Sequence, residues 1–158
     1  QRQMCIRDSF ITMLLTRYYY EPVFTTWEEP KKYGYYAYYL NSGQKEEKSK
    51  SFLPDLLYKY EPTSGTCKAV LDIKSKGGDP FINPDVFQMY FYCKTLRAKK
   101  GILIYPSDKN VEPIELSLTL PESEKVSMHA VYINLTGKET DFWQNIELFR
   151  KQIDQLVS

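Results

Sequence analysis

The sequence has little of what marks a membrane-spanning, disulfide-bonded or zinc-binding protein. Its 158 residues include three cysteines without a Cys-x-x-Cys pair, which argues against a disulfide framework, a zinc ribbon or a four-cysteine cluster. No apolar run approaches the roughly 20 residues that a membrane helix requires. We therefore expect a cytoplasmic protein with no membrane partner, in which Cys67 and Cys93 are small core residues.

An excess of charge of one sign is also missing. The 21 Lys and Arg residues oppose 20 Asp and Glu residues, which leaves a formal charge of +1, so any binding of DNA has to come from a local patch. A Gly-x-x-x-x-Gly-Lys-Ser/Thr loop is absent, which excludes nucleotide binding by that route. The one histidine, His129, falls in a strand-like run and is expected to be structural, which argues against a histidine-dependent triad.

The first nine residues, QRQMCIRDS, resemble the translated end of a sequencing adapter. We expect residues 1–9 to be a scar of this kind, which is set aside when the fold is predicted. The remaining residues, 10–158, are then expected to form one domain that is truncated at its amino terminus. A domain of this length can bury a core without disulfides or a structural metal.

Hydrophobic periodicity and turn residues predict an alternation of helices and strands. The predicted helices cover residues 10–20, 83–98 and 142–156, and the second of them is expected to be capped by Asn83. The predicted strands cover residues 23–27, 33–40, 53–60, 67–74, 101–105 and 126–135. The polar residues 41–51 are predicted to form a mobile loop. This pattern indicates an α/β (α+β) fold with a central mixed sheet flanked by helices.

The hairpin predicted from residues 53–60 and 67–74 determines which side chains face each other. Its loop contains a proline and a glycine, which favour a tight reversal. A reversal centred between positions 63 and 64 pairs residues whose numbers sum to 127, so that Asp55 faces Asp72. Facing carboxylates about 5 Å apart repel each other unless a cation or protons lie between them. Magnesium, which binds one or two carboxylates together with water and phosphate oxygens, is the expected cation.

Asp72 and Lys74 are two residues apart on one strand and therefore project from the same face, about 6.5 to 7 Å apart. The ammonium is thus expected beside the metal, where it can hold a phosphate or orient the attacking water. An Asp-x-Lys pair alone is more typical of a surface salt bridge. The Pro54-Asp55 pair, the register and the following helix favour the catalytic interpretation. On that helix Gln88 and Tyr92 are four apart and lie on one side, although Tyr92 taken singly is a more typical core residue.

With Pro54-Asp55, Asp72-Ile73-Lys74 and Gln88-x-x-x-Tyr92 in this order, the chain resembles the RecB-type branch of the PD-(D/E)xK nuclease superfamily. More narrowly, the blocks LPDLLYKYE, VLDIKSK, NPDVFQMYFY and GILIYPS resemble the McrC subunits of 5-methylcytosine restriction systems, over about residues 10–156. The resemblance implies a restriction-endonuclease-like core of helix, three strands, helix and strand. It also implies a Mg²⁺-dependent deoxyribonuclease, with Mn²⁺ as a substitute, that cuts DNA when driven by a McrB-like AAA+ GTPase.

The resemblance further implies a role for individual residues. The implied metal ligands are Asp55, Asp72 and the backbone carbonyl of Ile73, and the implied catalytic lysine is Lys74. The implied supporting residues are Gln88, Tyr92 and Lys76. The acidic residue that the family's first helix usually offers has no match, since Glu21 is not a convincing substitute. Two alternatives are left open, namely a RecB-like nuclease that acts without a GTPase and a catalytically dead module for interaction or DNA binding.

Overall fold

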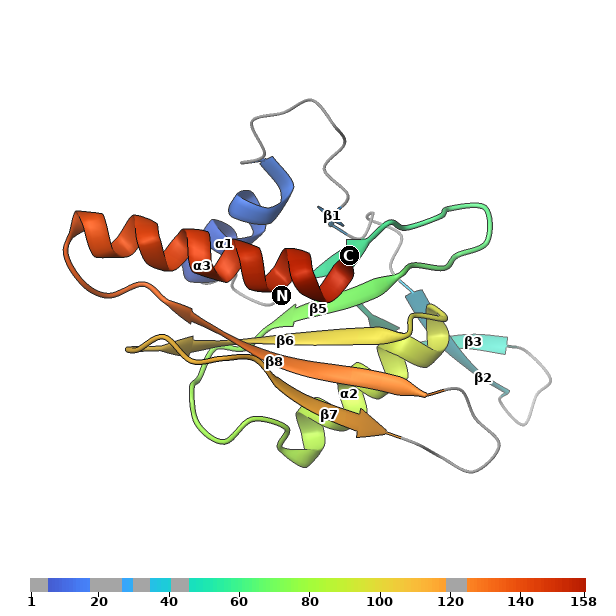
Figure 1. Cartoon of the computed structure of the whole chain (residues 1–158). Helices are drawn as coiled ribbons and strands as arrows, with labels where there is room; N and C mark the ends of the chain where they lie inside the picture. Colours follow the sequence, from blue (N-terminus) through green and yellow to red (C-terminus); the bar gives the residue numbers. More distant parts are fainter. Residues whose placement is uncertain (1–5, 18–26, 30–34, 41–45, 119–124) are drawn as a thin grey trace.

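The computed structural model describes residues 6–17, 27–29, 35–40, 46–118 and 125–158. Within these residues a six-stranded mixed sheet carries helices on both faces (Figure 1). In spatial order the strands are β1 (Trp27–Glu28), β4 (Leu56–Tyr58), β5 (Ala69–Ile73), β6 (Lys100–Ser107), β8 (Val126–Asn134) and β7 (Ile114–Leu118). The helices are α1 (Ile6–Arg17), α2 (Asn83–Thr95) and α3 (Glu139–Val157). The predicted α/β class, with a mixed sheet flanked by helices, is confirmed.

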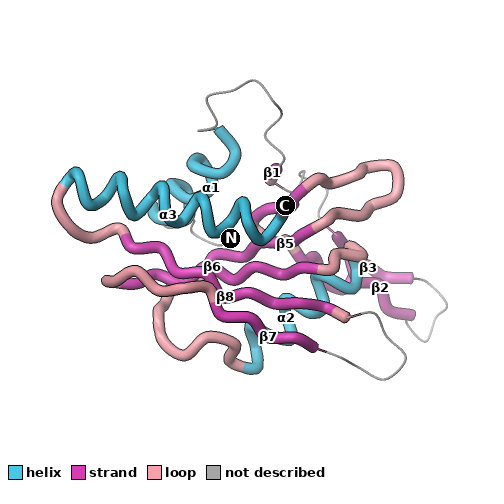
Figure 2. The backbone as a smooth tube through the Cα atoms, in the orientation of Figure 1, coloured by secondary structure: helices cyan, strands magenta, loops and turns pink. Residues whose placement is uncertain are grey.

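The alternation of side chains along the central strands divides the core into two layers. Leu71 and Ile73 of β5 belong to the apolar cluster formed with α1 and α3, whereas Val70 belongs to the cluster formed with α2. Figure 2 shows α3 and α2 on opposite faces of the sheet. Because β5 pairs in parallel with β6 and is covered on both faces, its residues are all buried, as expected for a central parallel strand. Asp72 is buried within this apolar run, on the α2 face.

The apolar stripe predicted on the last helix is confirmed. Ile146, Phe149 and Ile153 of α3 are buried in the cluster that covers one face of the sheet, and Phe142 and Leu156 pack against its edge. These residues recur at four- and three-residue spacing, which places them on one side of a helix. The predicted buried strand at 101–105 and the strand at 126–135 are likewise found, as β6 and β8.

The second helix differs from the prediction at both ends. Ile82 is the N-cap residue and makes no side-chain cap hydrogen bond, so the predicted cap by Asn83 is wrong. Asn83 and Pro84 are instead the first two helical residues, where the fixed φ of proline suits the helix. At the other end α2 stops at Thr95, before the predicted 98, because Arg97 has a positive φ of 52°.

Two further strands were not predicted. Residues 46–51 were predicted to be part of a loop, but Glu46–Phe52 forms β3, which pairs antiparallel with β2 (Tyr35–Leu40) in a separate two-stranded sheet. A neighbouring strand satisfies backbone hydrogen bonds whatever the side chains are, so a charged segment can join a sheet. The edge strand β7 was missed although Ile114, Leu116 and Leu118 alternate with polar residues, and the structure leaves it mostly exposed. Residues 18–26 and 41–45, where other predictions fall, lie outside the described residues.

His129, the one histidine of the sequence, was predicted to be a structural residue in a strand. His129 lies buried in β8, as predicted, and burial lowers the pKa of its imidazole, which favours the neutral form.

Residues 6–9, expected to be part of an adapter scar, form the first turn of α1, and their origin stays a prediction. Within the described ranges, none of the helices combines the length and the apolar character needed to cross a membrane.

We expect α3 to contribute to stability through Phe149, which is buried and only 1% exposed. Phe149→Ala should lower the free energy of unfolding by about 3–5 kcal/mol, because it removes a buried ring and leaves a cavity. Phe87→Ala is the matched control, since Phe87 is 69% exposed and should change stability by less than about 0.5 kcal/mol. Urea denaturation of both variants checks this, and equal effects would show that α3 does not pack as described.

The buried thiols should be inert in the folded protein. Burial raises the pKa of Cys67 and of Cys93 from 9.0 to about 12, and only the thiolate is reactive. In a Cys5→Ser chain, a thiol reagent at pH 8 should label no cysteine until urea unfolds the protein. The raised thiol pKa also makes the free energy of unfolding depend on pH. The contribution of the two thiols is complete below about pH 9 and is lost as the pH rises towards 12, because the thiols of the unfolded chain ionise first. Rapid labelling of the native chain would contradict this.

Candidate active site

The hairpin brings Asp55 to the end of β5, next to Asp72. Its register pairs Leu56 with Leu71, which confirms the predicted pairing of residue numbers that sum to 127. Asp55 lies one residue before β4 begins, and its Oδ2 accepts a hydrogen bond of 2.7 Å from the backbone N–H of Ile73. The Asp55 carboxylate is therefore held by the backbone N–H of Ile73, the residue that directly follows Asp72.

Three oxygen acceptors surround the ammonium of Lys74. Its Nζ lies 2.7 Å from Asp72 Oδ2 and 2.9 Å from Asp85 Oδ1, and it donates a hydrogen bond of 2.8 Å to Gln88 Oε1. The side chains of Lys74, Asp72 and Asp85 are 11%, 1% and 17% exposed. In such partly desolvated surroundings opposite charges attract more strongly than at the surface. The ammonium is therefore held beside Asp72, as the Asp-x-Lys spacing predicts.

This arrangement corrects one step of the sequence argument. The acids were expected to require an added cation or protons to relieve their repulsion. The structure shows that the Lys74 ammonium already lies at salt-bridge distance from Asp72, while Asp55 receives a backbone N–H. Neither carboxylate therefore needs a metal ion for the fold to be stable, and the case for a metal has to rest on the donor atoms instead.

The predicted pair on α2 is present and has a definite orientation. Gln88 Nε2 donates a hydrogen bond of 3.0 Å to the Tyr92 hydroxyl, which leaves Oε1 of the same amide to accept from Lys74. The ring of Tyr92 is 4% exposed and belongs to the apolar cluster under α2. Tyr92 is thus a core residue and also the residue that orients the Gln88 amide.

Asp85 and Tyr105 are members of the cluster that the sequence argument missed. Asp85 lies on α2 one turn before Gln88, and its Oδ2 accepts a hydrogen bond of 3.2 Å from the Tyr105 hydroxyl. Burial raises the pKa of Tyr105, so that this hydroxyl stays protonated and can donate. The three-residue spacing between Asp85 and Gln88 places them on one helix face, and this spacing is the feature of the sequence that pointed to Asp85.

The roles predicted for Lys76 and for the Ile73 carbonyl are not tested by the structure. Lys76 is exposed beyond the end of β5, and no ion pair joins it to the cluster in the described part of the chain, so its supporting role stays a prediction. The Ile73 carbonyl as a metal ligand also stays a prediction. Arg7 of α1 donates a hydrogen bond of 3.1 Å to the carbonyl oxygen of Lys74, which ties α1 to this edge. Glu21 lies outside the described residues.

The donor atoms fit an open magnesium site. The carboxylates of Asp55 and Asp72 are hard oxygen donors, and Asp55 is held at the end of β5 by the backbone N–H of Ile73, the residue after Asp72. Magnesium binds through one or two carboxylates and keeps several waters or phosphate oxygens. A closed cage is not found, because no group of three or more His, Cys, Asp or Glu side chains suited to a metal ion occurs among the described residues. The described donor set is thus not of the closed structural-zinc kind, and a Mg²⁺ ion at Asp55 and Asp72 stays a prediction.

Neither a protein-family model nor a curated protein matches the sequence. Among solved structures, a match is a chain from a refined half-complex of the tetradecameric assembly of Thermococcus gammatolerans McrB AAA+ hexamers with bound McrC. The fold resembles a chain of that McrB–McrC complex. The TM-score is 0.55 at 14% sequence identity, and the match covers 95% of this chain and 32% of the other. This chain thus spans about a third of the length of the chain it matches, and at this identity the likeness is one of fold.

The ion pair between Lys74 and Asp72 predicts that substitutions at these two residues change the free energy of unfolding non-additively. Lys74→Met should lower the free energy of unfolding by about 3–5 kcal/mol, because it leaves buried carboxylates without their cation. In the double variant Lys74→Met/Asp72→Asn, the cost should be about 1–3 kcal/mol smaller than the sum of the two single costs. Urea denaturation of the three variants measures this difference. Additive costs would show that the two side chains do not form the ion pair described here.

Proposed function

We propose that this chain is the metal-dependent DNA endonuclease domain of a McrC-like restriction subunit, driven by a McrB-like AAA+ GTPase. The observation that supports the proposal most is at the carboxyl end of β5, where Lys74 lies 2.7 Å from Asp72 and Asp55 accepts a hydrogen bond from the backbone N–H of Ile73. Two acidic oxygen donors beside a cation match the needs of phosphodiester hydrolysis, in which a metal and an ammonium both face a phosphate. The likeness of fold to a chain of a McrB–McrC complex supports the choice of partner.

In the proposed reaction the carboxylates of Asp55 and Asp72 hold the metal. A bound Mg²⁺ supplies a Lewis acid for the phosphate and lowers the pKa of a water molecule. Lys74 provides a fixed positive charge beside Asp72, where negative charge develops on the phosphate oxygens in the transition state.

Residues of α2 fix the position of the Lys74 ammonium. Asp85 and Gln88 both contact the Lys74 ammonium, and Tyr92 orients the Gln88 amide. When a phosphate enters and offers Lys74 a further anionic partner, these contacts keep the ammonium at the active site. Asp85 is thus a positioning residue in the proposed mechanism, since it acts through Lys74 and not on the substrate.

A catalytically dead module is the second candidate, and one observation favours it. The Lys74 ammonium compensates Asp72 and Asp85, so these acids are compatible with a stable fold that binds no metal. Such a protein retains DNA or partner binding and hydrolyses nothing. Cleavage that depends on Asp72 excludes this candidate, whereas cleavage that does not need a GTPase favours a self-sufficient RecB-like nuclease.

A DNA-cleavage assay tests the proposal. Supercoiled plasmid DNA is incubated with the chain and Mg²⁺ or Mn²⁺, with and without a McrB-type GTPase and GTP. Asp72→Asn should lower the cleavage rate at least about 100-fold, because it removes a charge that binds the metal. Glu112→Gln, an exposed acid in the loop after β6, is the matched control and should cleave like the unchanged chain. Equal cleavage by the Asp72→Asn chain would refute the proposal.

A further inference from the structure

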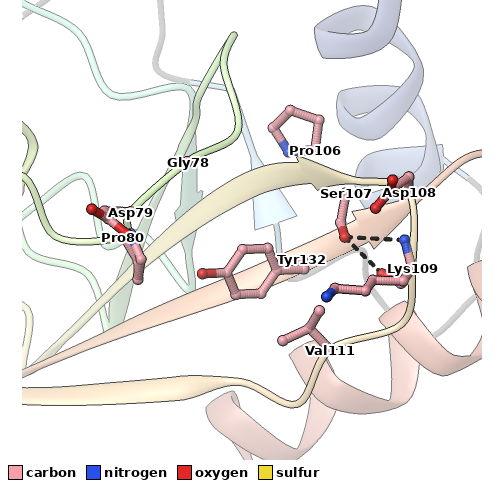
Figure 3. Close-up of a pocket in the computed structure, with 9 residues that line it drawn as sticks. All are labelled: Gly78, Asp79, Pro80, Pro106, Ser107, Asp108, Lys109, Val111 and Tyr132. Carbon is pink, nitrogen blue, oxygen red and sulfur yellow. Dashed lines mark hydrogen bonds between the residues drawn. The ribbon is translucent and has the colours of Figure 1, made fainter.

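A pocket opens at the same edge of the sheet as the proposed active site. It is a shallow depression of about 650 Å³ that is largely open to solvent. Figure 3 shows the Tyr132 ring between Asp79 and Pro80 on one side and Ser107 and Lys109 on the other. These groups come from the loop after β5, the end of β6 and the loop that follows it, and β8. The pocket therefore lies at the carboxyl ends of the three parallel strands, where ligands bind in open α/β sheets.

A row of side chains links this pocket to Lys74. Tyr105 pairs with Tyr132 across β6 and β8, and their ring centroids are 5.9 Å apart. Tyr105 and Lys74 share the Asp85 carboxylate. Because neighbouring strands are about 4.8 Å apart, the Tyr132 backbone lies two strands, or roughly 10 Å, from that of Lys74. This is the rise of about three stacked nucleotides at roughly 3.4 Å each.

The loop after β5, which supplies one wall of the pocket, passes close to the end of β6. A Cβ atom at Gly77 would lie 2.9 Å from the carbonyl oxygen of Pro106, and Gly78 has a positive φ of 138°. The loop can therefore pass close to the end of β6 only with these two glycines. Their conformation places Asp79 and Pro80 in the wall of the pocket.

The lining of the pocket suits a base better than a phosphate. Its charged residues are Asp79, Asp108 and Lys109, so acids outnumber bases and a phosphate is repelled. Tyr132 offers an aromatic face together with the rings of neighbouring prolines, and aromatic faces bind bases by stacking. Carboxylates accept hydrogen bonds from exocyclic amino groups such as N4 of cytosine. Burial, and then Asp79, raises the pKa of Tyr132, so its hydroxyl stays protonated as a further donor.

We infer that this pocket binds a nucleobase carrying an exocyclic amino group, from a DNA strand that also reaches the Asp55–Asp72–Lys74 site. The inference rests on the proposed function, since it takes the ligand to be part of the same substrate. Asp79 and Asp108 lie on opposite sides of Tyr132 (Figure 3), so either carboxylate can accept a hydrogen bond from the amino group of a base that stacks on Tyr132, while Lys109 binds the adjoining phosphate. The pocket thus gives a preference for cytosine, adenine or guanine over thymine, which has no exocyclic amino group, a few nucleotides from the bond that is cut.

Binding of labelled oligonucleotides in EDTA tests this inference without any need for catalysis. Fluorescence anisotropy compares single-stranded hexamers of deoxycytidylate and thymidylate on the 158-residue chain. The chain should bind the cytosine hexamer about tenfold more tightly, because thymine has no amino group to offer. Asp79→Asn/Asp108→Asn should abolish this preference. Tyr132→Ala should weaken both hexamers about tenfold by loss of stacking, and Tyr132→Phe should restore most of the affinity.

A matched control removes the same charge elsewhere. Glu112→Gln/Asp154→Asn takes away two exposed acids and should leave the ratio of the two affinities unchanged. Equal binding of both hexamers, no binding of either, or a preference that survives Asp79→Asn/Asp108→Asn would overturn the inference. Because the assay contains no divalent ion, these results are independent of cleavage. A pocket that fails while Asp72-dependent cleavage persists refutes the pocket alone, and the reverse refutes the nuclease alone.

Discussion

The ammonium of Lys74 is the contact that joins the sheet to α2 at its functional edge. It lies within 3 Å of Asp72 on β5 and of Asp85 and Gln88 on α2. Each of these oxygens is costly to bury without a donor, and the ammonium satisfies all three. The same interaction therefore supports the packing of α2 and places a positive charge where a phosphate would be attacked. Stability and the proposed chemistry share one set of ion pairs.

The parallel pairing of β5, β6 and β8 explains why the proposed active site and the pocket lie at one edge of the sheet. Parallel strands end at one edge, and the segments that follow them meet there. The end of β5 carries Lys74, whereas the loops after β5 and β6 line the pocket around Tyr132. Asp55, one residue before the antiparallel strand β4, reaches this edge from the other side of β5. The proposed active site and the proposed base-binding pocket thus lie next to each other along one edge of the sheet.

The sequence predicts those parts of the site that depend on local pattern. The hairpin register, the Asp72–Lys74 spacing and the stripe on α3 follow from periodicity and from one short turn. Asp85 was missed because its spacing from Gln88 shows only that both lie on one helix face, whereas its contact with Tyr105, 20 residues away, follows from no local rule. The strand β3 was missed because pairing with β2 overrides its polar composition. The pocket could not be predicted at all, since it needs the relative placement of two loops and β8.

The central claim is that Asp55 and Asp72 together form a divalent-metal site. Calorimetric titration of the chain with Mn²⁺ and Mg²⁺ tests it most directly, because binding of the ion needs neither DNA nor a partner protein. The account predicts binding that is lost in both Asp55→Asn and Asp72→Asn and is retained in Glu112→Gln. Absence of binding to the unchanged chain, or binding that survives both substitutions, would contradict it.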